Sequence, residues 1–426
     1  MFPAPCDLLL TGAGAVLTQD PGPGGLPRAA EIPKLSELPA GTAVAVAEGR
    51  IQALGPEEEL ARRWAPRRRL DARGGFVVPG FVDAHTHPVF CGDRSEEFEW
   101  RCQGLDYLEI ARRGGGILAS VERLRRASDE ELHGEVRRHL LRMLRHGTTS
   151  CEAKSGYGLT VRDELRSLRI LRAAAAELGM EVSPTFLGAH LVPAEHRDHP
   201  DRYLDLLCEE GLPAAAEDGL ARSADVFLEE HAFDLGRGRR YLERARELGL
   251  RLRVHAEQFA PLGGARLAVE LGADCADHLE ALSEEDAGLL AASPTFAGLL
   301  PAVPHFLRQE ADAPARLLLD AGARWFVATD FNPGSCYTPS LPEAIHFARL
   351  RLGLSVREAL AGATCLAAAS LGWEGRKGVL RPGADADLVV LDLPRVEGLG
   401  YAFGENPVRH VVLGGRVAVE DGCLAL

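Results

Sequence analysis

Between roughly residues 76 and 374, short apolar runs typical of β-strands alternate with amphipathic helical patterns. There are eight such runs, at residues 75–84, 147–153, 181–188, 225–230, 250–256, 272–278, 293–300 and 324–330. Helical patterns fill most of the intervals, and those at 129–147, 161–179 and 238–249 each end on a glycine. Eight β/α units in succession predict an α/β protein built on a (β/α)₈ barrel of the TIM type. A doubly wound sheet is the alternative, but no glycine-rich phosphate loop follows the first run.

The two ends of the chain carry short strand-like runs instead, found at residues 5–12, 43–54, 384–392 and 408–422. We expect these antiparallel strands to pair into one small β-sandwich assembled from both termini. The predicted domains are therefore an N-terminal part of the sandwich at 1–74, the barrel at 75–374 and a C-terminal part of the sandwich at 375–426. Two segments interrupt this scheme: residues 19–40, rich in Pro and Gly, predict an irregular surface loop, and residues 88–128 predict an insertion after the first barrel strand.

Charge and cysteine content narrow the class of function. The 426-residue chain has a formal net charge of −14, whereas nucleic acids and anionic membranes attract basic surfaces. Nine cysteines occur, an odd number without any C-x-x-C pair, which disfavours a disulfide framework or a thiolate zinc site. No signal peptide or membrane span is evident in the sequence. We therefore expect a cytoplasmic protein that acts on a small molecule, with no nucleic-acid or membrane partner.

Four of the barrel runs end in polar residues that can bind a metal. The first ends in Asp83-Ala-His85-Thr-His87, the fifth in His255-Ala-Glu-Gln258, the sixth in Asp277-His278 and the eighth in Thr329-Asp330-Phe-Asn332. Active sites of these barrels lie at the carboxyl ends of the strands, so the four groups should converge. We expect most of the other histidines, such as His133, His139, His146 and His410, to be solvated or to cap helices.

An H-x-H pair places two imidazoles on the same side of an extended chain, because side chains alternate with a period of two. A third imidazole from the fifth strand and a carboxylate from the eighth would complete a site for a first-row metal with open positions. Such a metal would lower the pKa of a bound water and polarise a carbonyl oxygen. A nearby carboxylate could then pass the proton to a leaving nitrogen.

Several stretches resemble the amidohydrolase superfamily, namely PGFVDAHTH, HAEQ, ADHLE and ATDFNPG. Within it, the chain is similar to the imidazolonepropionase family in the stretches FVDAHTHPVFCGDRSEEFE, CEAKSGYGL, FLGAHLVP, VHAEQF, GGARLAVELGADCADHLE and ATDFNPGSCYTPS. The resemblance spans nearly the whole barrel. It implies a barrel with a β-sandwich from both termini, and hydrolysis of 4-imidazolone-5-propanoate to N-formimino-L-glutamate in histidine degradation.

The resemblance also implies roles for individual residues. The metal ligands would be His85, His87, His255 and Asp330, holding one Zn²⁺ or Fe³⁺ per subunit. Asp330 would also act as the catalytic proton carrier, with His278 assisting beside the water. The implied substrate-binding residues are Arg94, Tyr157, His190, Gln258, Asn332, Gly334 and Ser335. Because members of this family are commonly dimeric, we expect a homodimer.

Some of these residues have other readings. Arg94 lies in a charged run and could be a surface charge, Tyr157 could be a buried residue of a β/α turn, and Asn332 could form an Asx turn before a proline. Lys154 follows the second strand, whereas the lysine that bridges two metals in some amidohydrolases follows the fourth, which here ends in Glu229-Glu230. A mononuclear site is therefore expected, with Lys154 or Glu230 left to a supporting ion pair.

Two other functions remain to be distinguished. Another mononuclear amidohydrolase, such as a purine or pyrimidine aminohydrolase, is disfavoured by Gln258, because an amide cannot shuttle a proton. Glu257 is adjacent but should point to the opposite face of its strand. A barrel that binds a ligand without catalysis is disfavoured by the complete set of metal ligands.

Overall fold

The computed structural model describes residues 3–22, 25–105, 109, 113, 115–217 and 219–426. Its centre is an eight-stranded parallel sheet whose strands follow one another in chain order. These strands are β8 (Phe81–Asp83), β9 (Thr148–Lys154), β10 (Glu181–Ala189), β11 (Ser223–Phe227), β12 (Arg251–Ala256), β13 (Cys275–His278), β14 (Phe296–Leu299) and β15 (Arg324–Val327). A parallel bridge between Thr86 and Phe331 joins the segments that follow β8 and β15, so the sheet curls into a nearly closed barrel.

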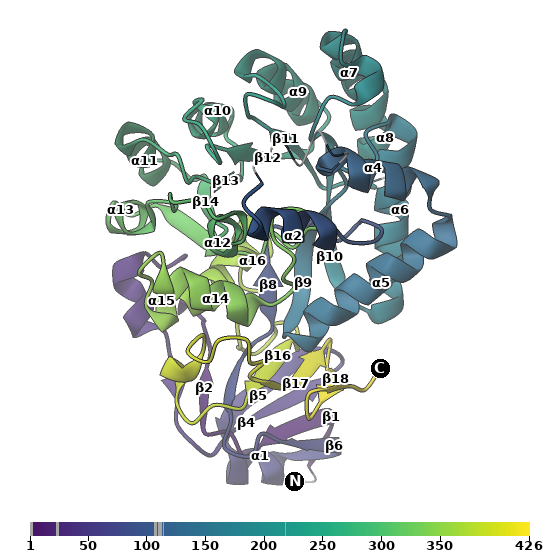
Figure 1. The fold of residues 1–426 in the computed structure, drawn as a ribbon. Helices are drawn as coiled ribbons and strands as arrows, with labels where there is room; N and C mark the ends of the chain where they lie inside the picture. The colour runs from purple at the N-terminus through teal and green to yellow at the C-terminus, as the bar shows by residue number, and fades with distance from the viewer. Residues whose placement is uncertain (1–2, 23–24, 106–108, 110–112, 114, 218) are drawn as a thin grey trace.

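Helices surround the barrel, as Figure 1 shows. They include α5 (Asp129–Arg145), α6 (Val161–Leu178), α9 (Leu235–Glu247), α10 (Gly264–Leu271), α11 (Glu284–Ala291), α13 (Ala315–Asp320), α14 (Leu341–Leu350), α15 (Val356–Gly362) and α16 (Cys365–Ser370). Local sequence sets their ends: Ser128 and Glu131 form a capping box at the start of α5, and α6 stops at Gly179, whose left-handed φ of 69° suits glycine. The predicted (β/α)₈ barrel is confirmed.

The segment between β8 and β9 adds two helices on the side of the barrel where the strands end, α2 (Ser95–Cys102) and α4 (Ile117–Arg126). Three further helical segments, α7 (Pro200–Leu206), the π-helix η4 (Leu207–Gly211) and α8 (Leu212–Glu217), lie between β10 and β11. The helix α12 (Ala302–Leu307) follows β14. The segments between β10 and β11 pack against α6 and α9 as part of the outer helical layer, whereas Leu307 of α12 and Ile117 of α4 line the cavity at the carboxyl ends of the strands.

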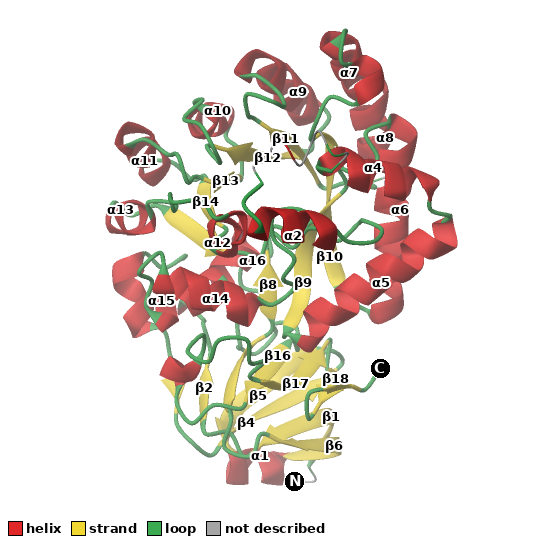
Figure 2. Ribbon diagram, viewed as in Figure 1, coloured by secondary structure: helices red, strands yellow, loops and turns green. Residues whose placement is uncertain are grey.

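The ends of the chain form two further sheets below the barrel (Figure 2). One has the order β5-β4-β1-β6, and the other β19-β18-β17-β16-β7-β2-β3. Their strands are β1 (Ala4–Thr11), β2 (Ala15–Leu17), β3 (Glu37–Leu38), β4 (Thr42–Ala47), β5 (Arg50–Pro56), β6 (Trp64–Asp71), β7 (Phe76–Pro79), β16 (Leu388–Leu391), β17 (Val408–Leu413), β18 (Arg416–Glu420) and β19 (Cys423–Leu424), with α1 (Glu57–Arg63) between β5 and β6. The second sheet joins both termini, as expected, although β1 with β6 and β2 with β7 pair in parallel rather than antiparallel.

The structure corrects two details of the predicted organisation. The run 75–84 is two strands: β7 pairs with β2 and β16 in the terminal sheet, and only β8 belongs to the barrel. Gly80 stands between them because a Cβ there would collide with the side chain of Thr149. The segment 19–40 is more ordered than a surface loop, since it contains the 3₁₀ helix η2 (Ala29–Lys34) and β3, and Ile32 is fully buried.

All nine cysteines lie among the described residues and carry free thiols, in agreement with the sequence. Within the described part of the chain, no helix combines the length and the apolar composition needed to cross a bilayer.

Candidate metal centre and substrate cavity

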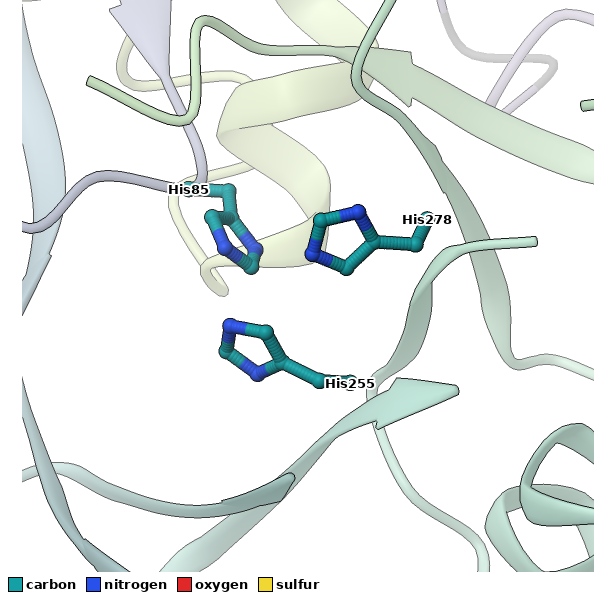
Figure 3. Close-up of side chains that lie close together, drawn as sticks. All are labelled: His85, His255 and His278. Atoms are coloured by element: carbon teal, nitrogen blue, oxygen red, sulfur yellow. The ribbon is translucent and has the colours of Figure 1, made fainter. Parts of the chain in front are cut away.

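Four imidazoles and one carboxylate meet at the carboxyl end of the barrel. His85 and His87 follow β8, His255 lies in β12, His278 ends β13 and Asp330 follows β15. Figure 3 shows three of these rings, from three separate strands, facing a common centre. Each of the five side chains is almost fully buried. The prediction that these residues converge at the carboxyl end of the barrel is therefore confirmed.

The distances define one compact cluster. His87 Nε2 lies 3.3 Å from His85 Nε2 and 3.4 Å from His255 Nε2. Asp330 Oδ1 lies 3.4 Å from His85 Nε2 and 3.3 Å from His87 Nε2. The potential ligand atoms of His85, His255 and His278, and those of His85, His87 and Asp330, each fall within 4.8 Å of one another.

Two buried carboxylates determine which ring nitrogen of His85 and of His255 faces the centre of the cluster. Asp277 Oδ2 accepts a hydrogen bond from His85 Nδ1 at 2.7 Å, and Asp225 accepts one from His255 Nδ1 at 3.1 Å. The proton of each neutral ring is thereby held on Nδ1, so the Nε2 lone pairs point into the cluster. Imidazole lone pairs that converge with a carboxylate on one point are typical ligands of a cation. The donor set therefore fits a metal ion.

The electrostatics of the cluster lead to the same conclusion. Burial disfavours a charged Asp330, but hydrogen bonds and charge from His85 and His87 hold the pKa of its carboxyl well below the usual range. Burial and Lys154 disfavour a charged His85, yet Asp277 and Asp330 raise its pKa to about 9. The carboxylates thus draw positive charge into the centre, as a cation site must. The donors are nitrogen and oxygen atoms, which suit zinc and iron alike.

A cavity of about 450 Å³ opens directly above this cluster. The walls contain every substrate-binding residue predicted from the sequence: Arg94, Tyr157, His190, Gln258, Asn332, Gly334 and Ser335. They also contain His87, His255, His278 and Asp330 from the cluster. A volume of this size is typical of small-molecule sites. Arg94 therefore lines the same cavity as the histidines and Asp330.

The loop after β15 is held in shape by Asn332. Its side-chain amide donates to the Asp330 carbonyl and to Ser335 Oγ, both at 2.7 Å. Its Oδ1 accepts the backbone N–H groups of Gly334 and Ser335 at 2.8 and 2.7 Å. Asn332 thus forms the Asx turn that the sequence allowed, and it also lines the cavity.

Two aromatic residues on the opposite wall remain uncharged. His190 Nδ1 lies 2.8 Å from the Gly156 carbonyl, and burial followed by the charge of His87 lowers the pKa of His190 to about 3. Burial also raises the pKa of Tyr157 well above its ordinary value. Both therefore offer neutral hydrogen-bonding groups to a ligand.

Gln258 and Glu257, which follow β12, point in different directions, as the sequence predicted. Gln258 faces the cavity. Glu257 points away, and its carboxylate accepts the N–H groups of Gly263, Gly264 and Ala265 at 2.8, 2.6 and 2.8 Å, where α10 begins. Glu257 thus caps a helix and does not reach the metal cluster.

The sequence predicted a supporting ion pair at Lys154 or Glu230, but it did not identify Glu152, Asp225 and Arg253 as members of a buried charged group. Lys154 Nζ lies 2.9 Å from Glu152 Oε1 and 2.8 Å from Asp225 Oδ2, and all three side chains are fully buried. Arg253 donates to the Ala84 carbonyl at 2.7 Å and lies 3.6 Å from Asp277. The sequence signal that could have revealed this group is the presence of charged residues inside otherwise apolar strands, as at Glu152, Asp225 and Arg253.

The structure also corrects three expectations around the site. The fourth barrel strand ends at Phe227 rather than at residue 230, and Glu230 is exposed, so the supporting ion pair belongs to Lys154 alone. His139 is neither solvated nor a cap: it is fully buried, stacks on Phe90 and lies 2.8 Å from the Pro88 carbonyl. His410 is buried as well.

Comparisons with known proteins agree with this geometry. The model of the amidohydrolase family matches residues 76–418. Two solved structures share the fold: an adenosine deaminase from Xanthomonas campestris with bound zinc (TM-score 0.76, 22% identity, 99% of this chain and 95% of that one) and a triazine hydrolase from Arthrobacter aurescens (TM-score 0.77, 18% identity, 98% and 96%). The chain belongs to the amidohydrolase family.

Curated relatives narrow the assignment. An imidazolonepropionase from Symbiobacterium thermophilum is 46% identical over 98% of both chains. Another, from Rubrobacter xylanophilus, is 48% identical over 87% of this chain and 89% of that one. Within the amidohydrolases, the chain therefore groups with the imidazolonepropionases.

Proposed function

We propose that this protein hydrolyses the ring of 4-imidazolone-5-propanoate to N-formimino-L-glutamate, a step of histidine degradation. The observation that carries the proposal is a single cavity with two matched features. Imidazoles and a carboxylate that fit a metal lie at its base, where a ring carbonyl can react, and a guanidinium in its wall can bind a carboxylate. The substrate carries both groups, a cyclic amide and a propionate.

His85, His87, His255 and Asp330 would hold one Zn²⁺ or Fe³⁺ per subunit. When bound, this ion supplies an activated water and polarises the ring carbonyl. The Lys154 ammonium is engaged by Glu152 and Asp225, which supports a mononuclear centre.

Asp330 is the proposed proton carrier. Its Oδ1 lies 3.4 and 3.3 Å from the Nε2 atoms of His85 and His87, and its Oδ2 lies 3.4 Å from Ser335 Oγ. It would take a proton from the attacking water and deliver it to the ring nitrogen as the C–N bond breaks. The buried His278 ring faces the same centre and would steady the water or the developing oxyanion.

The remaining residues would position the substrate. Arg94, Tyr157 and His190 would hold the propionate, while Gln258, Asn332, Gly334 and Ser335 would contact the ring. In this proposal the barrel, which begins at β8, carries the chemistry, and the strands of both termini, β7 included, form the supporting sandwich.

We also propose that the protein is a cytoplasmic homodimer that binds neither nucleic acid nor membranes. Large apolar side chains exposed on the monomer support an association between copies: Tyr401 is 81% exposed, Leu350 71% and Phe403 63%. Sedimentation of the purified protein would show twice the mass of one chain. A monomer at micromolar concentration would contradict the homodimer.

The activity is tested by a coupled assay on protein of known metal content. Urocanate hydratase would generate the unstable imidazolone from urocanate, and its ultraviolet absorbance would fall as the ring opens. Formation of N-formimino-L-glutamate, identified by mass, supports the proposal. Stoichiometric metal without turnover would contradict it, and ammonia release from aminated heterocycles would favour an aminohydrolase.

A further inference from the structure

A second arginine, Arg101, lies beside Arg94 in the wall of the cavity. Arg94 is the N-cap residue of α2, and Arg101 follows it by seven positions, so the two lie on the same face of this helix. Both approach Gly334 in the loop after β15. Arg101 Nη2 lies 3.4 Å from the Gly334 carbonyl, and a Cβ at Gly334 would collide with the Arg94 guanidinium.

The two arginines differ in whether their guanidinium groups already pair with a carboxylate. Arg94 Nη2 donates to Glu97 Oε2 at 2.6 Å, and Glu97 is itself buried. Arg101 Nη1 is buried but has no hydrogen-bond partner among the described residues. Its guanidinium carbon lies 5.4 Å from the centroid of the Phe306 ring, which stabilises a cation without accepting a directed hydrogen bond.

Charge balance follows directly from these contacts. Among the described residues, the two guanidinium groups share one carboxylate, that of Glu97, which leaves one positive charge in this part of the cavity wall. Arg101 is half-buried, and leaving its buried Nη1 donor unpaired costs free energy. A guanidinium binds a carboxylate through paired N–H donors. The arrangement is therefore complementary to a ligand that brings one negative charge.

We propose that Arg101 is a specificity-determining residue that binds the propionate carboxylate of the substrate together with Arg94. This inference rests on the proposed function, because that function supplies the ligand with one carboxylate. Glu97 fixes Arg94 in place, and Arg101 provides the charge that the substrate neutralises. An otherwise identical ligand without the carboxylate would leave that charge unpaired and would bind weakly.

Two probes that differ in a single group test this role. They are 3-(imidazol-4-yl)propanoate and its uncharged amide, 3-(imidazol-4-yl)propanamide, and their binding to the metal-loaded protein is measured by calorimetry. In the wild type the propanoate should bind more tightly. Arg101→Met should weaken propanoate binding about 10- to 100-fold, the range for a hydrogen bond to a charged group, and should change amide binding less than about threefold.

Two further variants separate charge from structure. Arg101→Lys keeps the positive charge but lacks the paired N–H donors of a guanidinium. It should therefore retain part of the propanoate affinity that Arg101→Met loses. Arg308→Met is the matched control, because Arg308 is exposed, donates to the Arg101 carbonyl at 3.3 Å and does not line this cavity. It should leave both affinities unchanged. In turnover, Arg101→Met should raise KM by a factor similar to the loss in affinity, with little change in kcat.

The outcomes separate the two proposals. Equal weakening of both probes in Arg101→Met, or no recovery in Arg101→Lys, would assign Arg101 a structural role and overturn the inference. Equal binding of both probes by the wild type would also overturn it. A wild type that discriminates through Arg101 but does not open the imidazolone ring would overturn the proposed function and retain the carboxylate site.

Discussion

Replacing Asp225 by Asn should weaken metal binding without unfolding the barrel. Asp225 joins Lys154 Nζ, at 2.8 Å, to His255 Nδ1, at 3.1 Å, so it holds the ring in the tautomer that presents Nε2. Asn keeps the shape of the side chain but loses the charge. It also allows the amide NH₂ to face the ring, which favours the wrong tautomer. Lys154 retains Glu152 at 2.9 Å, so its ammonium stays paired.

The expected loss in metal affinity is about 10- to 100-fold, the range for partners that orient metal-binding histidines. This corresponds to about 1.4 to 3 kcal/mol. Competition with a chromophoric chelator would measure the metal dissociation constant, and urea unfolding of the metal-free protein would measure stability separately.

Asp274→Asn is the matched control for this experiment. Asp274 pairs with Arg251 at 2.5 and 2.8 Å, at the opposite end of β12 from His255. Asp274→Asn removes a carboxylate that lies beside β12, as Asp225 does, but contacts no proposed ligand, so metal affinity should not change. If Asp225→Asn bound metal as tightly as the wild type, the positioning role of the buried charged group would be refuted.

Three further perturbations test other parts of the account. Asp330→Asn should lower turnover at least about 100-fold in the coupled assay, and near-normal turnover with metal retained would remove Asp330 as proton carrier. Burial lowers the pKa of His139 to about 4, so the unfolded chain binds a proton that the folded one rejects. His139 should therefore contribute a fall of about 2 kcal/mol in the free energy of unfolding from pH 7 to pH 5. His139→Gln should remove this contribution and make the slope shallower in urea titrations; an unchanged slope would contradict it. Glu257→Gln should cost about 1–3 kcal/mol in urea unfolding, because one carboxylate accepts three N–H groups at the start of α10, whereas lost metal affinity without lost stability would place Glu257 in the site instead.

The barrel and its metal cluster could be predicted because both follow from local patterns. Strand ends lie at one edge of a parallel barrel, so His85, His255 and Asp330 had to converge once the strands were recognised. The H-x-H spacing further places His85 and His87 on one side of the chain. Neither inference requires knowledge of which side chains touch across the sheet.

The supporting contacts depend on register between strands, which no local pattern reports. Asp225 reaches His255 because β11 and β12 pair with Phe227 opposite His255. The role of Lys154 likewise requires β9 to bring it beside Asp225 through β10. Arg101 was hidden among many arginines of a charged insertion, and its place depends on how α2 folds back over Gly334.

The split of the run 75–84 has a similar cause. An uninterrupted apolar run predicts one strand. In the structure the chain leaves the terminal sheet and enters the barrel at Gly80, which packs closely against Thr149. Close approach of distant segments at a glycine can be seen only in the folded structure.

In the proposed reaction, a single metal ion at these imidazoles supports hydrolytic opening of an imidazolone ring. This reaction is tested most directly by titrating the metal-free protein with zinc or iron while measuring turnover and product mass. We predict that activity rises until one metal per chain is bound, that the product mass equals the substrate plus one water, and that His85→Ala/His87→Ala abolishes both binding and turnover. Metal-independent product, or release of ammonia in place of ring opening, would contradict the account.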